Sequence, residues 1–277
     1  MRLPFVKMHG LGNDFVVLDQ RARDYALDAA TYRTLADRRR GIGCDQILVL
    51  DPPTRTAAAV RYRVVNADGT PAEHCGNGVR CVAAYLARDG HAPHGEVAVE
   101  IGDEVFTVRH TDNGEVRVDM GRPRFAPDAI PLAVPSMAER YALHHAGQGY
   151  EFGAVSLGNP HAVFEVDRVD EAPVESLGAA LQAHPLFPAR VNVGFMQVMS
   201  GAHIRLRVFE RGVGETAACG TGACAAVAIG RRWGRLGPRV DVDLRGGRLA
   251  IEWGGQADDR LWMTGPATFV FEGIIDL

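Results

Sequence analysis

Lysine is almost absent from this chain of 277 residues: Lys7 is the only one, and arginine supplies every other strongly basic side chain. A lysine that forms a Schiff base with a cofactor or a substrate is therefore excluded at every position except 7. A general excess of positive charge is missing as well, because the formal net charge is −4 and the isoelectric point is about 6.2. Without a broad basic surface, we expect no nucleic-acid partner.

Long apolar runs are also lacking. The first ten residues have no apolar core of the kind found in a signal peptide, and no run approaches the roughly 18 apolar residues of a membrane span. The five cysteines are an odd number, which favours free thiols over a disulfide framework. We therefore expect a cytoplasmic protein with no membrane partner. Its composition, 47% hydrophobic and 23% charged, is that of a globular chain long enough for two lobes.

Two of the five cysteines occupy matching settings. Cys75 begins the segment 75–78 (CGNG), and Cys219 begins the segment 219–222 (CGTG). Each segment lies between a strand-like run and an apolar, helix-like run. A cysteine just before a helix has backbone N–H groups and the positive helix end near its sulfur, which favours the thiolate. Two such sulfurs facing one cavity can act as an acid and a base.

The duplication extends beyond the cysteines. Segment 12–18 (GNDFVVL) resembles segment 158–164 (GNPHAVF) at an offset of 146 residues, and Gln46 matches Asn192 at the same offset. The two cysteines are 144 residues apart, a difference that one loop insertion explains. A repeat of about half the chain predicts two similar lobes rather than a solenoid, whose units have roughly 20 to 50 residues.

Alternation of apolar and polar residues predicts strands before both cysteine segments, at 61–65 and 203–209, and further strands downstream. The downstream strands are expected at 115–120, 239–244 and 248–253. Helical spacing of apolar residues after Cys75 predicts an amphipathic helix that includes Val79, Val82, Ala83 and Leu86. After Cys219, the stretch 223–229 is apolar on all sides and predicts a buried helix. The chain is thus strand-dominated, with one key helix in each lobe.

A proline-rich stretch at 122–135 suggests a crossing between the lobes. We therefore place an N-terminal lobe at 1–119, which carries Cys75, and a C-terminal lobe at 120–264, which carries Cys219. The last segment, 265–277, is expected to pack back on the N-terminal lobe.

Several ordered motifs resemble the diaminopimelate epimerase family. They are 10–15 (GLGNDF), 66–69 (NADG), 75–81 (CGNGVRC), 158–161 (GNPH), 210–216 (ERGVGET) and 218–222 (ACGTG). The resemblance runs from the first ten residues to 263–267 and 270–273, nearly the whole chain. It implies an α+β fold of two pseudo-symmetric lobes, each a mostly antiparallel sheet wrapped around a central helix.

The resemblance also implies a homodimeric, cofactor-independent isomerase without a metal. Such an enzyme interconverts L,L- and meso-diaminopimelate on the route to lysine and peptidoglycan precursors. Inversion at an α-carbon needs one group on each face, and the resemblance implies that Cys219 accepts the proton and Cys75 donates one in the L,L to meso direction. Backbone N–H groups at the two helix starts would bind the substrate carboxylate as its charge grows, in place of a pyridoxal electron sink.

Family similarity implies a larger set of site residues. Glu210 suits an ammonium group and Arg211 a distal carboxylate, while His161 and Glu210 are implied to set the protonation of the thiols. A purely structural role for His161 stays open. Cys81 and Cys224 are expected to be buried and inert, and Cys44 to serve packing. The implied substrate-binding residues are Asn13, Gln46, Asn66, Gly76, Asn77, Asn159, Asn192, Glu210, Arg211, Gly220 and Thr221.

Three alternatives are weaker. Gly212, Gly214 and Ala217, with Asp241 downstream, match a dinucleotide fingerprint, but the regular strand and helix alternation of that fold is missing. The cysteine spacings do not follow the paired pattern of a structural metal site. A proline racemase typically has histidine where Asn77 stands. The departures from the commonest epimerase pattern are small, namely His74 and Thr221.

Overall fold

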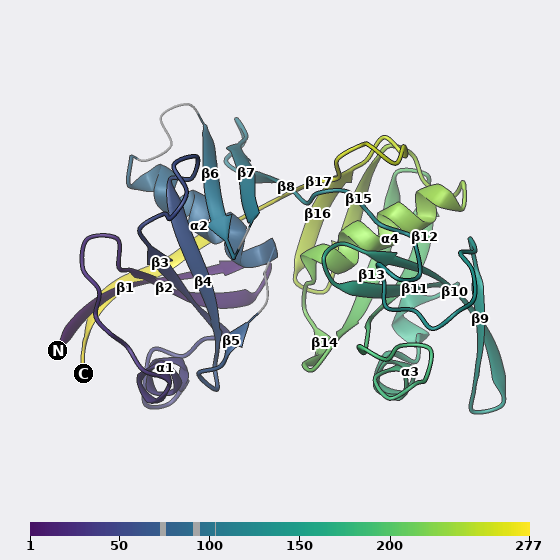
Figure 1. Ribbon diagram of the computed structural model, residues 1–277, viewed down its shortest axis with the longest axis horizontal. Helices are drawn as coiled ribbons and strands as arrows, with labels where there is room; N and C mark the ends of the chain where they lie inside the picture. Colours follow the sequence, from purple (N-terminus) through teal and green to yellow (C-terminus); the bar gives the residue numbers. More distant parts are fainter. Residues whose placement is uncertain (73–75, 91–94, 103) are drawn as a thin grey trace. The chain divides into compact units, whose positions relative to one another are not determined.

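The computed structural model describes residues 1–72, 76–90, 95–102 and 104–277. Contacts within the chain define two compact units. The first unit comprises Met1–Val118 and Gly265–Leu277, and the second comprises Asp119–Thr264. Each unit combines a curved sheet with helices, as Figure 1 shows. Among the described residues, no helix combines the length and the apolar composition needed to cross a membrane.

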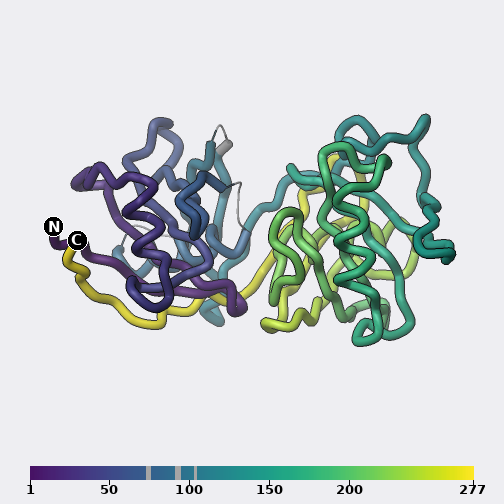
Figure 2. The backbone as a smooth tube through the Cα atoms, turned by 90° about the horizontal axis from the view of Figure 1, so that it is seen from below, coloured from purple at the N-terminus to yellow at the C-terminus, as the bar shows by residue number. Residues whose placement is uncertain are grey.

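The described part of the first unit contains two helices and a sheet that includes both ends of the chain. Strand β18 (Thr268–Asp276) pairs antiparallel with β1 (Arg2–Gly10), so the C-terminal segment runs beside the N-terminal strand, as Figure 2 shows. The remaining elements are β2 (Asn13–Asp19), α1 (Ala29–Ala36), β3 (Gln46–Asp51), β4 (Val60–Asn66), β5 (Pro71–Ala72), α2 (Gly76–Arg88), β6 (Glu96–Ile101), β7 (Glu104–His110) and β8 (Val116–Asp119).

The second unit has the same kind of architecture. Its strands are β9 (Tyr141–His145), β10 (Gln148–Ser156), β11 (Pro160–Glu165), β12 (Asn192–Ser200), β13 (His203–Glu210), β14 (Gly214–Thr216), β15 (Arg239–Leu244), β16 (Gly247–Glu252) and β17 (Trp262–Gly265). Its helices are α3 (Val174–Leu181), α4 (Gly220–Arg232) and the short 3₁₀ helix η1 (Val169–Glu171).

Strand register confirms the internal repeat. In the first unit β2 runs parallel to β3 with Phe15 opposite Gln46, and in the second unit β11 runs parallel to β12 with His161 opposite Asn192. Both residues of the first pair differ from their counterparts by the offset of 146. The parallel pairs β4–β6 and β13–β15 also correspond. The other named pairs are antiparallel, so the prediction of mostly antiparallel sheets is confirmed.

The central helices follow their cysteine segments as predicted. Helix α2 buries Val79, Val82, Ala83 and Leu86, which lie at the predicted spacing. Helix α4 is buried on all sides from Gly220 to Gly230. Small residues allow this burial, because a Cβ atom added at Gly153 of β10 would lie only 2.6 Å from the side chain of Ile229. The sheet of the second unit thus contacts α4 closely.

Two shorter helices were missed by the sequence analysis, which named one per lobe. Helix α1 begins after Asp28, whose carboxylate caps the backbone N–H of Thr31 at 2.8 Å. Helix α3 buries Leu177 and Leu181, one turn apart. Eight residues give too few turns for a clear apolar period, although the Asp28 cap was a readable signal for α1.

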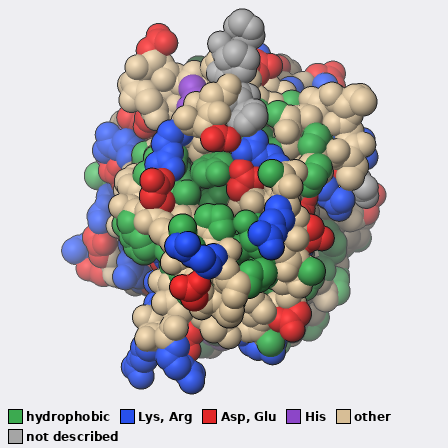
Figure 3. Space-filling view, turned by 90° about the vertical axis from the view of Figure 1, so that its left-hand side faces the viewer, with side chains coloured by type: hydrophobic (Ala, Val, Ile, Leu, Met, Phe, Trp, Pro, Cys, Tyr) green, Lys and Arg blue, Asp and Glu red, His purple; other side chains and the backbone are tan. Residues whose placement is uncertain are grey.

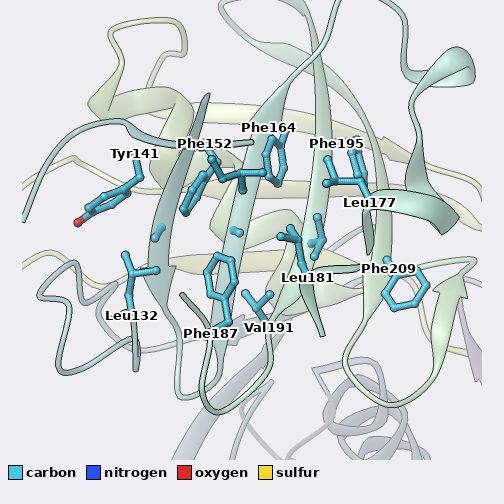
Figure 4. Close-up of a cluster of buried hydrophobic side chains, with 14 of the residues drawn as sticks. Leu132, Tyr141, Phe152, Phe164, Leu177, Leu181, Phe187, Val191, Phe195 and Phe209 are labelled. Atoms are coloured by element: carbon cyan, nitrogen blue, oxygen red, sulfur yellow. The ribbon is translucent and has the colours of Figure 1, made fainter. Parts of the chain in front are cut away.

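Helices α3 and α4 cover opposite faces of the second sheet, because adjacent strand residues point to opposite faces. Gly153 faces Ile229 of α4, whereas its neighbour Phe152 belongs to the cluster around α3. Figure 4 shows this cluster, in which Phe164 stacks on Phe195 with ring centres 5.6 Å apart. Ile130, within the proline-rich stretch 122–135, belongs to the same core.

In the first unit, the corresponding cluster lies around α1 and includes Cys44. The Cys44 side chain is buried, and burial raises the pKa of its thiol to about 11. The packing role expected for Cys44 is confirmed.

An ionic network, buried at Lys7 and exposed at Arg38 and Asp45, ties strands β1 and β2 to the loop before β3. The ammonium of Lys7 donates to the Asp14 carboxylate at 2.5 Å and to the Gly43 carbonyl. Arg38 donates to both oxygens of Asp14, at 2.7 and 2.9 Å, and to Asp45 at 2.7 Å. Burial alone would raise the pKa of Asp14, but hydrogen bonds from Arg38 and Lys7 hold it well below its usual range. The only lysine of the chain is therefore a structural cation.

Replacing Lys7 with methionine should lower the free energy of unfolding by about 3 kcal/mol, because Asp14 and the Gly43 carbonyl lose a buried partner. The urea midpoint of purified protein at neutral pH measures this loss. Arg2→Met on the same strand is the matched control: Arg2 lies 4.0 Å from Asp276, and both side chains are largely exposed. Its effect should stay within about 0.5 kcal/mol.

The loss should depend on pH in a defined direction. Because the folded state lowers the pKa of Asp14, its charged form stabilises the fold fully above the unfolded pKa of about 3.9 and progressively less below it. Because Arg38 still lowers the pKa of Asp14 in Lys7→Met, the gap between wild type and variant should narrow only below about pH 4, as Asp14 of the variant becomes protonated. A gap that widens as the pH falls from 7 would contradict this account of the network.

Candidate active site

The predicted residues of the first unit gather at one edge of its sheet. Asn13 begins β2, Gln46 begins β3 and Asn66 ends β4. Strands β2 and β3 are parallel and β4 is antiparallel to β3, so these three positions lie at the same ends of neighbouring strands. Helix α2 begins beside them with Gly76 and Asn77.

Side-chain hydrogen bonds connect this set. The Gln46 amide donates to Asn66 Oδ1 at 3.1 Å, and the Asn77 amide donates to Asn13 Oδ1 at 3.3 Å. Asn13 donates in turn to Asp45 Oδ2 at 3.1 Å, which connects it to the ionic network of Lys7. The structure thus brings together all described first-unit residues of the predicted site and fixes the directions of their amides.

Arg80 was missed by the sequence analysis. Its side chain is fully buried in α2 and donates to Asn77 Oδ1 at 2.9 Å, to the Gly76 carbonyl at 3.3 Å and to the Pro266 carbonyl at 3.1 Å. It therefore anchors the start of α2 and the segment leading into β18. A charged residue within the otherwise apolar buried face of a predicted helix was the available signal.

Two positions named from the sequence, His74 and Cys75, lie outside the described residues. Cys75 immediately precedes α2 in the chain. Its catalytic role stays a prediction.

The second unit repeats the arrangement with different side chains. Asn159 precedes β11, Asn192 begins β12, and Glu210 ends β13 with Arg211 directly after it. Cys219 is the N-terminal cap of helix α4. The predicted site residues of this unit therefore also lie at the ends of neighbouring strands and at a helix start.

Cys219 is held by the first turn of α4. The backbone N–H of Gly222 donates to its sulfur at 3.4 Å, and the Thr221 hydroxyl lies 3.5 Å from the sulfur. The N–H groups of Gly220 and Thr221 belong to the same turn, where the helix offers them no carbonyl partner. This helix start can bind an anionic group beside the thiol.

The thiol of Cys219 is not acidified by this position. Burial raises its pKa well above the usual value, and the negative charge of Glu210 raises it further, against hydrogen bonds from Thr221 and Gly222. The first turn of α4 does favour the thiolate, as predicted, but burial and Glu210 outweigh it, so the net shift of the pKa is upward. Helix-end charges are worth about 1 kcal/mol, whereas full burial of a charged group costs several. Near neutral pH, Cys219 is a thiol.

Glu210 is the acidic group beside this thiol. Burial raises the pKa of its carboxyl, while hydrogen bonds from Thr216 and Cys219 lower it. The Thr216 hydroxyl donates to Oε1 at 2.5 Å. Glu210 is therefore placed to receive the proton that Cys219 must lose before it can act as a base.

His161 is joined to the cysteine through two side chains. Asn159 donates from Nδ2 to the Thr221 hydroxyl oxygen at 3.4 Å, so its Oδ1 accepts from His161 Nε2 at 2.9 Å. Since the oxygen can only accept, Nε2 carries the proton. Burial lowers the pKa of His161 to about 3, and Arg211 contributes to the decrease. A neutral imidazole thus orients Asn159.

Asn192 uses both ends of its amide to hold backbone. It donates to the Pro160 carbonyl at 3.0 Å and accepts from the Arg211 backbone N–H at 2.9 Å. The Arg211 guanidinium donates to the Ala189 carbonyl at 3.1 Å. Asn192 therefore fixes the chain at the point where Arg211 leaves strand β13.

The structure also bears on the two remaining described cysteines and on two of the alternative functions. Cys81 and Cys224 are buried free thiols inside α2 and α4, as predicted. Gly212 and Gly214 lie in the turn and strand of the β13–β14 hairpin. A dinucleotide fingerprint requires a strand, a turn and then a helix, so this alternative is wrong. Within the described part of the chain, no group of three or more potential metal ligands comes together.

Comparisons with known proteins agree with this geometry. The family model described as diaminopimelate epimerase matches residues 5–126 and 153–270. Proteins named diaminopimelate epimerase include one from Alkalilimnicola ehrlichii, 54% identical over 100% of both chains, and one from Nitrosomonas europaea, 50% identical over 100% of both. A third, from Thioalkalivibrio sulfidiphilus, is 53% identical over 100% of both.

Solved structures share the fold at low identity. A hydroxyproline epimerase from Agrobacterium vitis has a TM-score of 0.71 at 16% identity, with coverage of 99% of this chain and 92% of that one. A PhzF-family protein from Bacillus anthracis has a TM-score of 0.69 at 13% identity, with coverage of 100% of both chains. Because their sequence identity to this chain is low, these structures show only that the fold is shared. The full-length relatives at 50–54% identity show the family. The chain belongs to the diaminopimelate epimerase family.

Proposed function

We propose that this protein interconverts L,L- and meso-diaminopimelate without a cofactor, by acid and base chemistry at two cysteines. The observation that carries the proposal is the buried thiol of Cys219, which caps helix α4 beside the Glu210 carboxyl. Family membership supplies the substrate. The reaction belongs to the synthesis of lysine and peptidoglycan precursors. The free thiols of the protein suit the reducing environment of the cytoplasm.

Substrate binding begins with the carboxylate next to the reacting carbon. The N–H groups of Gly220 and Thr221 bind it in the second unit, and those of Gly76 and Asn77 serve the same purpose in the first. Negative charge on this carboxylate grows as the α-proton leaves, so these groups bind the transition state more tightly than the substrate. Arg211 binds the distal carboxylate through its guanidinium.

The polar amides of both units complete recognition. Neutral amide donors and acceptors face the ammonium and carboxylate ends of the substrate. They are presented or positioned by Asn13, Gln46, Asn66, Asn159 and Asn192. Their mutual hydrogen bonds fix these directions before substrate arrives, which lowers the entropic cost of binding. His161 contributes as a positioning residue for Asn159.

Proton transfer starts from a neutral thiol. Glu210 takes the proton from the sulfur of Cys219, and the thiolate then removes the α-proton of L,L-diaminopimelate to become a thiol again. The Cys75 thiol gives its proton to the opposite face of the carbon and is left as a thiolate. The reverse reaction exchanges the two roles. Each transfer moves one proton, and no electrons are gained or lost. Before the next forward turnover, Glu210 releases its proton to solvent and Cys75 takes one from solvent, which restores the starting state.

The substrate test follows L,L-diaminopimelate in heavy water by proton NMR, under reducing conditions and without added cofactor. We expect the meso isomer with deuterium at one α-carbon. Cys219→Ala and Cys75→Ala should each reduce conversion by about 1000-fold or more, because each removes one of the two proton-transfer groups. Cys224→Ala and Cys44→Ala, at buried thiols outside the mechanism, are the controls. Substantial conversion by either catalytic variant would refute the two-cysteine mechanism.

We also infer that the protein is a homodimer through the outer surface of β18. Val270, Phe271 and Ile274 on this strand are 52%, 49% and 54% exposed. Beside them lies a hollow of about 430 Å³ whose lining includes Phe5 and Tyr85. On the face of the first unit shown in Figure 3, hydrophobic side chains gather in a hollow bordered by charged ones. A second copy of this face would bury these apolar groups.

Sedimentation equilibrium at micromolar concentration should give twice the chain mass of 29.9 kDa. Phe271→Asp should shift the protein to a monomer, because a charge would be buried at the contact. Val105→Asp, at an exposed position on β7 of the same unit, is the matched control and should leave the dimer intact. A monomeric wild type would overturn the inference.

A further inference from the structure

Among the described residues, Thr216 is the only one whose side-chain hydroxyl hydrogen-bonds to the Glu210 carboxyl. It ends strand β14, which pairs antiparallel with β13 so that Thr216 lies opposite Val208. Its hydroxyl donates to Glu210 Oε1 at 2.5 Å. The hairpin thus returns a donor to a carboxyl that lies six residues earlier in the chain.

Strand β14 is anchored on its other face by an ion pair. The Glu215 carboxylate is buried and accepts from Arg207 at 2.7 and 2.8 Å, and Arg245 lies 3.2 Å away. Arg207 also donates to the Val169 carbonyl. Since adjacent strand residues point to opposite faces, this anchor holds Thr216 in place without itself entering the site.

The charged and titratable groups around Glu210 determine what the Thr216 hydroxyl contributes to its ionisation. Cys219, at the start of α4, and Glu210 lie close enough for each to shift the pKa of the other, while the charge of Arg211 acts on His161 of β11. A hydroxyl that donates to a carboxylate favours its ionised form and occupies one of its oxygens. Thr216 occupies Oε1 of Glu210 in this way.

We propose that Thr216 is a positioning residue that keeps Glu210 ionised and turned towards Cys219, ready to receive the thiol proton. Its catalytic consequence rests on the proposed function, since Glu210 must act on Cys219 for the alignment to matter. The direct effect of substituting Thr216, a change in the ionisation of the Glu210 carboxyl, does not depend on any substrate.

Thr216→Val removes the hydroxyl at nearly constant shape, and Thr216→Ser keeps it. The first readout is the titration of the Glu210 carboxyl by carbon-13 NMR in glutamate-labelled protein, with the resonance assigned from Glu210→Gln. Loss of one hydrogen bond should move this titration upward by about one pH unit in Thr216→Val. The serine variant should titrate like wild type. An unchanged titration in Thr216→Val would overturn the proposal.

The second readout is kcat/KM for epimerisation against pH. Because Glu210 must be ionised, Thr216→Val should move the acid limb upward by about one pH unit and lower kcat about 10- to 100-fold, with KM little changed. Thr216→Ser should restore both. A fall in activity with an unmoved acid limb and no rescue by serine would mean that Thr216 only supports the fold, which contradicts the proposal.

Two controls separate the possible failures. Glu215→Gln keeps the Thr216 hydroxyl but weakens the ion pair that anchors β14, so it should lower the urea midpoint and move the Glu210 titration less than Thr216→Val does. Thr107→Val makes the same substitution on β7 of the first unit and should change neither. A wild type that is inactive on diaminopimelate would overturn the proposed function, while the carboxyl titration would still decide the role of Thr216.

Discussion

A thiol that is buried beside a carboxylate keeps its proton, and the chemistry of the second unit depends on this constraint. Burial and the charge of Glu210 both oppose the thiolate of Cys219, while the Gly222 N–H and the Thr221 hydroxyl favour it. In the proposed mechanism, the resting base is therefore the pair of Cys219 and Glu210 rather than a free thiolate. A protonated thiol also protects the sulfur, because oxidation and alkylation proceed through the thiolate.

The repeated sheet register explains how two halves of one chain provide similar sites. Parallel pairing sets Phe15 opposite Gln46 and His161 opposite Asn192. Each unit then places a helix start next to the ends of the same strands, so backbone N–H groups and short polar side chains meet there. Side chains differ where the tasks differ: Asn66 ends β4, whereas Glu210 ends β13. Under the proposed function, the backbone offers an anion site at the start of each helix, and the different side chains at the ends of β4 and β13 distinguish the two sites.

The sequence was sufficient to predict the features that local patterns determine. Val79 to Leu86 showed the period of α2, the apolar run after Cys219 showed α4, and the repeated segments anticipated the shared register. It failed where the answer depends on packing. The pKa of Cys219 is set by desolvation, which no motif displays, and the contacts of Arg80 and Thr216 join residues that only the folded sheet brings together. Helices α1 and α3 were too short for their period to stand out.

Charge balance explains why neutral groups dominate around the reacting carbon. His161 is uncharged because it is buried, and Cys219 is uncharged for the same reason, so Glu210 and Arg211 carry the local charge. An amino acid arrives as a zwitterion, and its carboxylate at the start of α4 would raise the pKa of the thiol unless its ammonium offset that effect. Neutral amides bind both ends without fixing this balance in advance. In the proposed mechanism, the proton can then pass from Cys219 to Glu210 once the substrate is bound, which would link recognition to the first step of catalysis.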